Sequence, residues 1–153
     1  MGYTSIVVGT DGSTTAERAV RQAAALAADE GARLVVVSAY EPKGTLAASP
    51  EAARVPDDIR FTLTDRAQTE ALAEQGRAIA REAGAGKVVV QALEGDPAGV
   101  LIEAARDFDA DLIVVGSRGL TSHAHFILGS VAASVAHHAP CDVLVAHTTK
   151  VDA

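Results

Sequence analysis

The chain has 153 residues, a length that predicts a single domain over residues 1–153 with a sizeable buried core. It is 48% hydrophobic but only 3% aromatic, so we expect a core of Val, Ile, Leu and Ala. A formal net charge of −7 argues against nucleic-acid and anionic-membrane partners, which need a basic surface. Without a recognisable signal peptide or membrane span, and with Cys141 as the only cysteine, a cytoplasmic protein without an intrachain disulfide is expected.

Five short apolar segments predict the strands of a parallel sheet. The middle of each is a continuous run of Val, Ile or Leu rather than an alternating pattern, which is typical of strands buried on both faces. The predicted strands are Ser5–Thr10, Leu34–Ala39, Val88–Leu93, Asp111–Gly116 and Asp142–His147.

Helical periodicity separates these strands. Ser13 or Thr14 can cap the first helix, and Thr14 with Glu17 has the spacing of a capping box. Asp96 is the expected N-cap of the third helix, with Pro97 in its first turn. The first predicted helix ends near Gly31, and the second runs from about Thr64 to Ala83. The third reaches Phe108, and the fourth extends from Gly129–Ser130 to just before Pro140. Alternation of this kind predicts a doubly wound α/β fold with helices on both faces of the sheet.

One long irregular segment, Glu41–Phe61, interrupts the alternation after the second strand. It contains three prolines and one glycine, and a structureless stretch of this length is uncommon in a compact domain. A lid or partner surface is one interpretation, and a mobile surface excursion is the other. The sequence does not decide between them.

Two loops follow strands at the edge where doubly wound proteins bind ligands. One is "GTDGS", residues 9–13, and the other is "GSRGLTSHAHFILGSV", residues 116–131. In the second loop Gly116 permits close approach to the backbone, and Gly119 tolerates a positive φ. Gly129 and Ser130 open a helix whose free N–H groups and positive dipole end favour an anion. These features predict a phosphate site, the alternative being glycines that only shape a turn.

The glycine spacing of the second loop carries a family resemblance. Gly116-x2-Gly119-x9-Gly129-Ser130 matches the motif of universal stress proteins, and "IVVGTDGS" and "EGDPAGVLIEAARDFDADLIVVGSRG" resemble the same family. The similarity covers at least residues 5–148. It implies a five-stranded sheet of order 3-2-1-4-5 with a nucleotide, typically ATP, between strands 1 and 4.

The resemblance also implies which residues touch the nucleotide. Asp11 would meet ribose or adenine above a floor of Gly9 and Thr10, Ala39 would touch adenine, and Gly95 would border the pocket. Gly116 and Gly119 would flank the ribose and α-phosphate, Gly129, Ser130 and Val131 would donate to phosphates, and Ser117, Arg118 and Leu120 would belong to the covering loop.

Several of these residues have a plainer interpretation. Asp11 can shape an Asx turn or cap a helix, and Ser130 can be an N-cap. Arg118 can be solvated instead of pairing with phosphate. His123 and His125 can neutralise phosphate or simply be exposed. No residue pattern indicates a metal site, although Mg²⁺ or Mn²⁺ can enter with a nucleotide.

The remaining histidines and the cysteine have structural interpretations. His137 and His138 suit the end of the last helix, where a cation complements the dipole. His147 alternates with apolar neighbours and can be an interface residue, and Cys141 is expected to be a buried apolar residue.

The expected function is ATP binding as a slow switch or sensor. No catalytic constellation is evident, so hydrolysis would be slow at most. One alternative is cyclic AMP, because "VVVSAYEP" and "DVLVAHTT" are similar to the subgroup that prefers it. The other is a protein-interaction module with an unused pocket. A homodimer is expected through the last strand, at Val143, Leu144, Val145 and Ala146.

Overall fold

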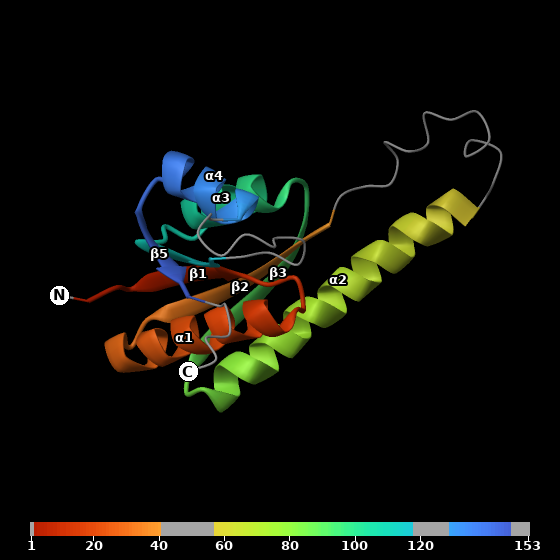
Figure 1. The fold of residues 1–153 in the computed structure, drawn as a ribbon. Helices are drawn as coiled ribbons and strands as arrows, with labels where there is room; N and C mark the ends of the chain where they lie inside the picture. Colours follow the sequence, from red (N-terminus) through yellow and green to blue (C-terminus); the bar gives the residue numbers. More distant parts are fainter. Residues whose placement is uncertain (1, 41–56, 118–128, 148–153) are drawn as a thin grey trace, which may run out of the picture.

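The strands form one five-stranded parallel sheet in the computed structural model, which describes residues 2–40, 57–117 and 129–147 (Figure 1). They are β1 (Ser5–Gly9), β2 (Arg33–Tyr40), β3 (Lys87–Glu94), β4 (Leu112–Gly116) and β5 (Asp142–Ala146). Their order is β3-β2-β1-β4-β5, which confirms the predicted topology. The strand order reverses beside β1, where Val7 lies in register with Val35 of β2 and Ile113 of β4.

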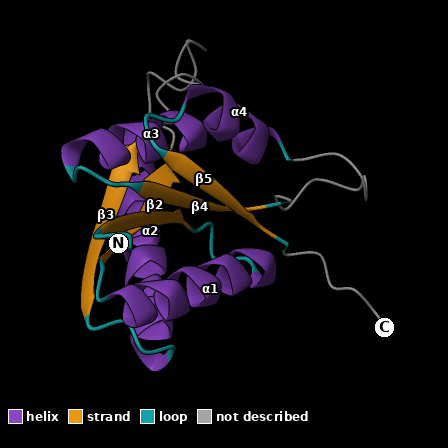
Figure 2. Ribbon diagram, turned by 90° about the vertical axis from the view of Figure 1, so that its left-hand side faces the viewer, coloured by secondary structure: helices purple, strands orange, loops and turns teal. Residues whose placement is uncertain are grey.

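Four helices cover the two faces of this sheet. They are α1 (Thr14–Glu30), α2 (Asp57–Glu82), α3 (Pro97–Asp107) and α4 (Ser130–His138). In Figure 2, α1 and α2 lie on one side of the sheet and α3 and α4 on the other. Successive β1 residues alternate between these layers, so Ile6 and Val8 pack with α1 while Val7 packs with α3. The β1 side chains are buried on both faces, as their continuous apolar character predicts.

The helix ends follow the predicted signals with one correction. Ser13 is the N-cap of α1, and its Oγ accepts a hydrogen bond of 3.1 Å from the N–H of Ala16. Thr14 is therefore the first helical residue, and the capping box proposed for it is wrong. Asp96 caps α3 as predicted, and Gly31 ends α1 in the left-handed conformation.

The start of α2 was the largest error of the sequence-based prediction. The helix begins at Asp57 rather than near Thr64, so residues 57–61 of the supposed irregular segment are helical. In the sequence Pro56 precedes two acidic residues, a pattern typical of a helix start, and the prediction overlooked this signal. Residues 41–56 lie outside the described part, so both interpretations of that segment stay untested. No helix in the described ranges is both long and apolar enough to cross a bilayer.

Asp111 holds the N-terminal end of β1, at the edge of the sheet opposite the glycine-rich loops. Its carboxylate accepts hydrogen bonds from the N–H groups of Thr4 and Ser5, at 3.0 and 3.1 Å, and from the Thr4 hydroxyl at 3.1 Å. Burial opposes ionisation of this carboxyl, but the hydrogen bonds from Thr4 and Ser5 outweigh it and lower its pKa below the usual value.

Asp111→Asn is expected to lower the free energy of unfolding at pH 7 by about 1–2 kcal/mol. Because folding lowers the pKa of Asp111, its stabilisation is present above the unfolded pKa and is lost as pH falls through the folded value. The difference from wild type should therefore shrink below about pH 4 in urea unfolding series. Asp109→Asn is the control, since Asp109 is exposed and Asn tolerates its positive φ of 49°. An equal loss at every pH would contradict this role.

Candidate functional site

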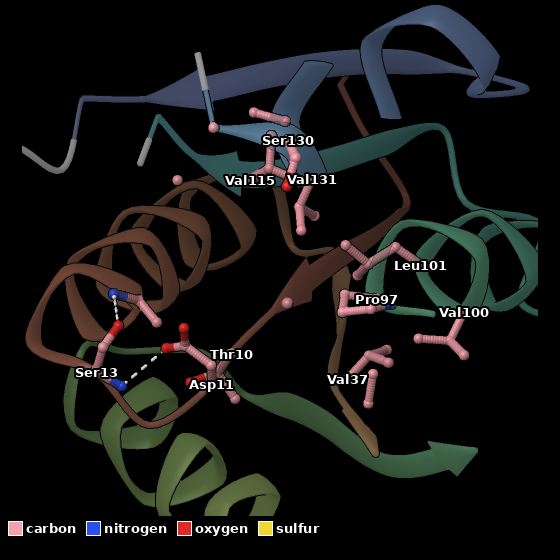
Figure 3. A pocket seen from close by; sticks show the side chains of 16 residues that line it. Thr10, Asp11, Ser13, Val37, Pro97, Val100, Leu101, Val115, Ser130 and Val131 are labelled. Atoms are coloured by element: carbon pink, nitrogen blue, oxygen red, sulfur yellow. Dashed lines mark hydrogen bonds between the residues drawn. The ribbon is translucent and has the colours of Figure 1, made fainter. Parts of the chain in front are cut away.

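A pocket of about 200 Å³ opens at the carboxyl ends of β1, β2 and β4 (Figure 3). It lies where the strand order reverses, the usual ligand position in a doubly wound sheet. The residues that line it are Gly9, Thr10, Asp11, Ser13, Ala16, Val37, Ala39, Pro97, Val100, Leu101, Val115, Gly116, Gly129, Ser130, Val131 and Ala132.

The turn after β1 forms one side of the pocket, and its backbone is tightly held. The N–H of Thr10 donates to the Val37 carbonyl at 2.9 Å, which extends the pairing of β1 with β2. The buried Ser38 hydroxyl donates to the Thr10 carbonyl at 2.8 Å. Both backbone polar groups of Thr10 are therefore satisfied, and the turn enters the pocket in a defined direction.

Asp11 forms an Asx turn at this position. Its Oδ1 accepts from the N–H of Ser13 at 2.9 Å (Figure 3). The N–H of Gly12 donates to the Thr10 hydroxyl at 3.1 Å. The structural interpretation of Asp11 is thus confirmed, yet Asp11 also lines the pocket and is exposed. Within the described residues its Oδ2 has no hydrogen-bond partner, so that oxygen can accept a bond from a ligand.

The start of α4 supplies backbone donors on the other side. Gly129 is the N-cap, which places Ser130 at the first helical position and makes the N-cap interpretation of Ser130 wrong. The Gly129 N–H, which was expected to donate to a phosphate, donates to the Ser117 carbonyl at 2.9 Å in this structure, so its contact with a phosphate stays a prediction. Helix geometry leaves the N–H groups of Ser130, Val131 and Ala132 without intrahelical acceptors, and all three residues line the pocket.

Between these two polar sides lies an apolar wall. Val37 and Ala39 come from β2, and Pro97, Val100 and Leu101 come from α3 (Figure 3). Val100 and Leu101 are 3% and 4% exposed, so this wall is part of the core and is rigid. The flat face of a ring such as a nucleobase fits the chemistry of this wall.

Asp11 is the only ionisable side chain among the described lining residues. The N-terminal ends of α1, α3 and α4 all contribute residues to the pocket, through Ser13, Pro97 and Ser130. Their dipoles place partial positive charge there, which favours an anion, and the Asp11 carboxylate disfavours one in its own vicinity. In the parts of the chain that the structure describes, no three His, Cys, Asp or Glu residues could together hold a metal.

The structure brings most of the described candidate residues together. Those that line the pocket are Gly9, Thr10, Asp11, Ala39, Gly116, Gly129, Ser130 and Val131. Gly95 is not among the lining residues. Its φ of +140° and its close approach to Val100 indicate a structural role in the turn after β3. That the candidate residues contact a nucleotide stays a prediction.

Ser117 is also absent from the lining, but its peptide connects two elements around the pocket. Its N–H donates to the Ala146 carbonyl of β5 at 2.8 Å, and its carbonyl accepts from Gly129. The candidates Arg118, Gly119 and Leu120, like His123 and His125, lie outside the described residues.

The sequence-based prediction missed eight of the lining residues, among them all those that α3 contributes. The missed residues are Ser13, Ala16, Val37, Pro97, Val100, Leu101, Val115 and Ala132. Val37 and Val115 closely precede predicted site residues in their strands, and this proximity was a usable signal. Val100 and Leu101 were assigned only to the core, because a helical apolar stripe does not reveal which end of the sheet it reaches.

Comparisons with known proteins agree with this architecture. A family model described as the universal stress protein family matches residues 2–147. A universal stress protein of Mycobacterium tuberculosis is 39% identical over 147 residues, which cover 96% of this chain and 98% of that protein.

Two similar solved structures contain nucleotides. A universal stress protein in complex with cAMP is 34% identical, with a TM-score of 0.73 over 97% of this chain and 100% of that one. The universal stress protein from Archaeoglobus fulgidus in complex with dAMP is 28% identical, with a TM-score of 0.65 over 95% of this chain and 98% of that one.

Proposed function

Because this chain belongs to the universal stress protein family, we propose that its pocket binds an adenine nucleotide with one phosphate group, namely cyclic AMP, and that the protein acts as a sensor. The observation that carries the proposal is the shape and chemistry of the pocket. An apolar wall lies between the turn that carries the Asp11 carboxylate and the free backbone N–H groups at the start of α4.

Each part of cyclic AMP has a counterpart in this arrangement. The base would lie against Ala39 and Val100, where apolar burial favours it. The phosphate would accept hydrogen bonds from Ser130 and Val131. Asp11 would repel the phosphate, so its free oxygen would accept a bond from the 2′-hydroxyl of the sugar. This orientation satisfies every polar group named.

The charge of the pocket favours one phosphate over three. ATP carries several more negative charges than cyclic AMP, and the described lining offers no Lys or Arg to balance them. The two related complexes, with cAMP and dAMP, also hold nucleotides with one phosphate. Cyclic AMP is therefore the better-supported ligand.

ATP with Mg²⁺ or Mn²⁺ is the second candidate. The spacing of Gly116, Gly119, Gly129 and Ser130 favours it, since this motif is the one associated with ATP in the resemblance. A divalent ion bridging the phosphates would supply the positive charge that the described lining lacks. Under this alternative the protein would be a slow switch, with hydrolysis over minutes to hours.

Isothermal titration calorimetry with cyclic AMP, ATP with Mg²⁺, and cyclic GMP tests the proposal. We expect cyclic AMP to bind at least about tenfold more tightly than the other two, which corresponds to about 1.4 kcal/mol. Tighter binding of ATP would favour the switch. Binding of none of them by a stable dimer would favour the interaction module with an unused pocket.

We further propose that the chain forms a homodimer through β5, an edge strand of the sheet. Val143 and Leu144 are half-buried. Val145 is 37% exposed, and among the described residues it is the only large hydrophobic residue that is exposed. An edge strand leaves unpaired backbone groups that a second copy can pair with, in antiparallel fashion, along Val143 to Ala146.

Val145→Arg is expected to convert the dimer to a monomer at micromolar concentration, because two guanidinium groups would be brought together at the two-fold axis. Val145→Thr keeps the β-branched shape and should stay dimeric. Light scattering coupled to gel filtration measures both. A wild-type monomer, or a dimer unaffected by Arg, would contradict the proposed interface.

A further inference from the structure

Helix α2 packs directly against the turn that carries Asp11. Gly12 has a φ of +80°, and a Cβ placed on it would lie only 2.4 Å from Cδ2 of Leu72. The Leu72 side chain therefore occupies the space that any other residue at position 12 would fill. Leu72 therefore packs against Gly12.

One helical turn further along α2, a second contact follows the same line. A Cβ on Gly76 would lie 2.7 Å from Cγ1 of Val36 and 3.5 Å from Cγ2 of Thr10. Glycine disfavours a helix interior, so its presence here is explained by the close approach of α2 to β2. Leu72 and Gly76 are four residues apart and share one helix face, which lies against the turn from Thr10 to Gly12.

Leu72 does not serve the core in the way its neighbours do. Ala80 belongs to the apolar cluster beneath α1 and α2 and Ile79 packs against it, whereas Leu72 is half-buried and belongs to neither core cluster of the described residues. Its close contact with Gly12 is what sets it apart. The contact fixes the turn from outside, while the Asx hydrogen bond of Asp11 fixes it from inside.

We propose that Leu72 is a positioning residue, which by packing on Gly12 holds the Asp11 carboxylate in the direction that selects the sugar of the ligand. This inference rests on the proposed function, because Asp11 is taken to accept the 2′-hydroxyl. It assigns to a residue that is not part of the pocket lining the ability to set ribose specificity.

Discrimination between cyclic AMP and 2′-deoxy cyclic AMP tests this inference. In wild type we expect a preference for the ribonucleotide of about tenfold, the usual effect of one hydrogen bond to a charged group. Leu72→Ala should reduce the preference below about threefold. Ile79→Ala is the matched control on the same helix, and it should leave the ratio unchanged. In an Asp11→Asn background, Leu72→Ala should have no further effect on the ratio.

Hydrogen exchange of the free protein gives a readout that needs no ligand. The N–H of Ser13 donates to Asp11, so its exchange reports the Asx turn. Leu72→Ala should accelerate this exchange at least about tenfold, and Ile79→Ala should not. Unchanged exchange, or an unchanged sugar preference despite tight binding, overturns the positioning role. If Leu72→Ala accelerates the exchange but the protein binds no nucleotide, Leu72 still positions the turn, and only the proposed function is overturned.

Discussion

Ser130→Asp is expected to weaken cyclic AMP binding by at least about 100-fold while leaving the fold as stable as wild type. Ser130 lines the pocket and is the first residue of α4, so the new carboxylate would meet the phosphate at contact distance. Two like charges about 4 Å apart near a protein surface repel by about 4 kcal/mol, which exceeds what this loss requires. A carboxylate in the first turn of a helix interacts favourably with the helix dipole, so the free energy of unfolding should not decrease.

Ser130→Asn separates charge from size, because Asn has nearly the shape of Asp without its charge. It should retain affinity for cyclic AMP within about tenfold of wild type. Adenosine, which has no phosphate, should bind all three proteins equally in titration calorimetry. If Asp and Asn variants lose cyclic AMP equally, or if Ser130→Asp also loses adenosine, the phosphate does not lie at the start of α4.

The fold could be predicted because its signals are local. Each strand is a continuous apolar run, so no knowledge of the partner strands was needed to recognise "SIVVG" or "LIVVG". The strand ends were placed within one residue, since apolar runs stop where the sheet does. The order of the strands, in contrast, came from the family resemblance, because periodicity carries no information about which strands are neighbours.

The site was predictable where one segment of chain builds it. Asp11 and the pair Gly129–Ser130 lie in loops whose composition already indicates a turn and a helix start. Val100 and Leu101 reach the pocket only because α3 crosses the sheet beside β1 and β2, and no local signal records that crossing. The engagement of Gly129 with Ser117 likewise depends on two segments meeting in space.

The contact of Leu72 with Gly12 illustrates the same limit at longer range. "GTDGS" shows that a glycine permits a positive φ at position 12, but not that a side chain of α2 fills the space beside it. Gly76 stood in the sequence as a helix-disfavouring residue within a predicted helix. Such a residue signals a close approach of backbone to a neighbour, and this signal was available before the structure identified Val36 as the neighbour.

Ala39→Phe is expected to abolish binding of both cyclic AMP and adenosine, with affinity reduced at least about 100-fold. Ala39 is half-buried in β2 and lines the apolar wall, so a phenyl ring would occupy the space proposed for the base. Aromatic residues are favoured in strands, so the free energy of unfolding should change by no more than about 1 kcal/mol. Calorimetry with adenosine and thermal unfolding measure the two effects separately.

Ala92→Phe is the matched control for this substitution. Ala92 lies in the neighbouring strand β3 opposite Ser38, so its side chain is on the α2 face of the sheet, away from the pocket. It should retain wild-type affinity for both ligands. The pattern across variants then divides the pocket in two: Ser130→Asp loses only the charged ligand, whereas Ala39→Phe loses both. Adenosine binding that survives in Ala39→Phe would place the base elsewhere, because a base and a phenyl ring cannot share one wall of this size.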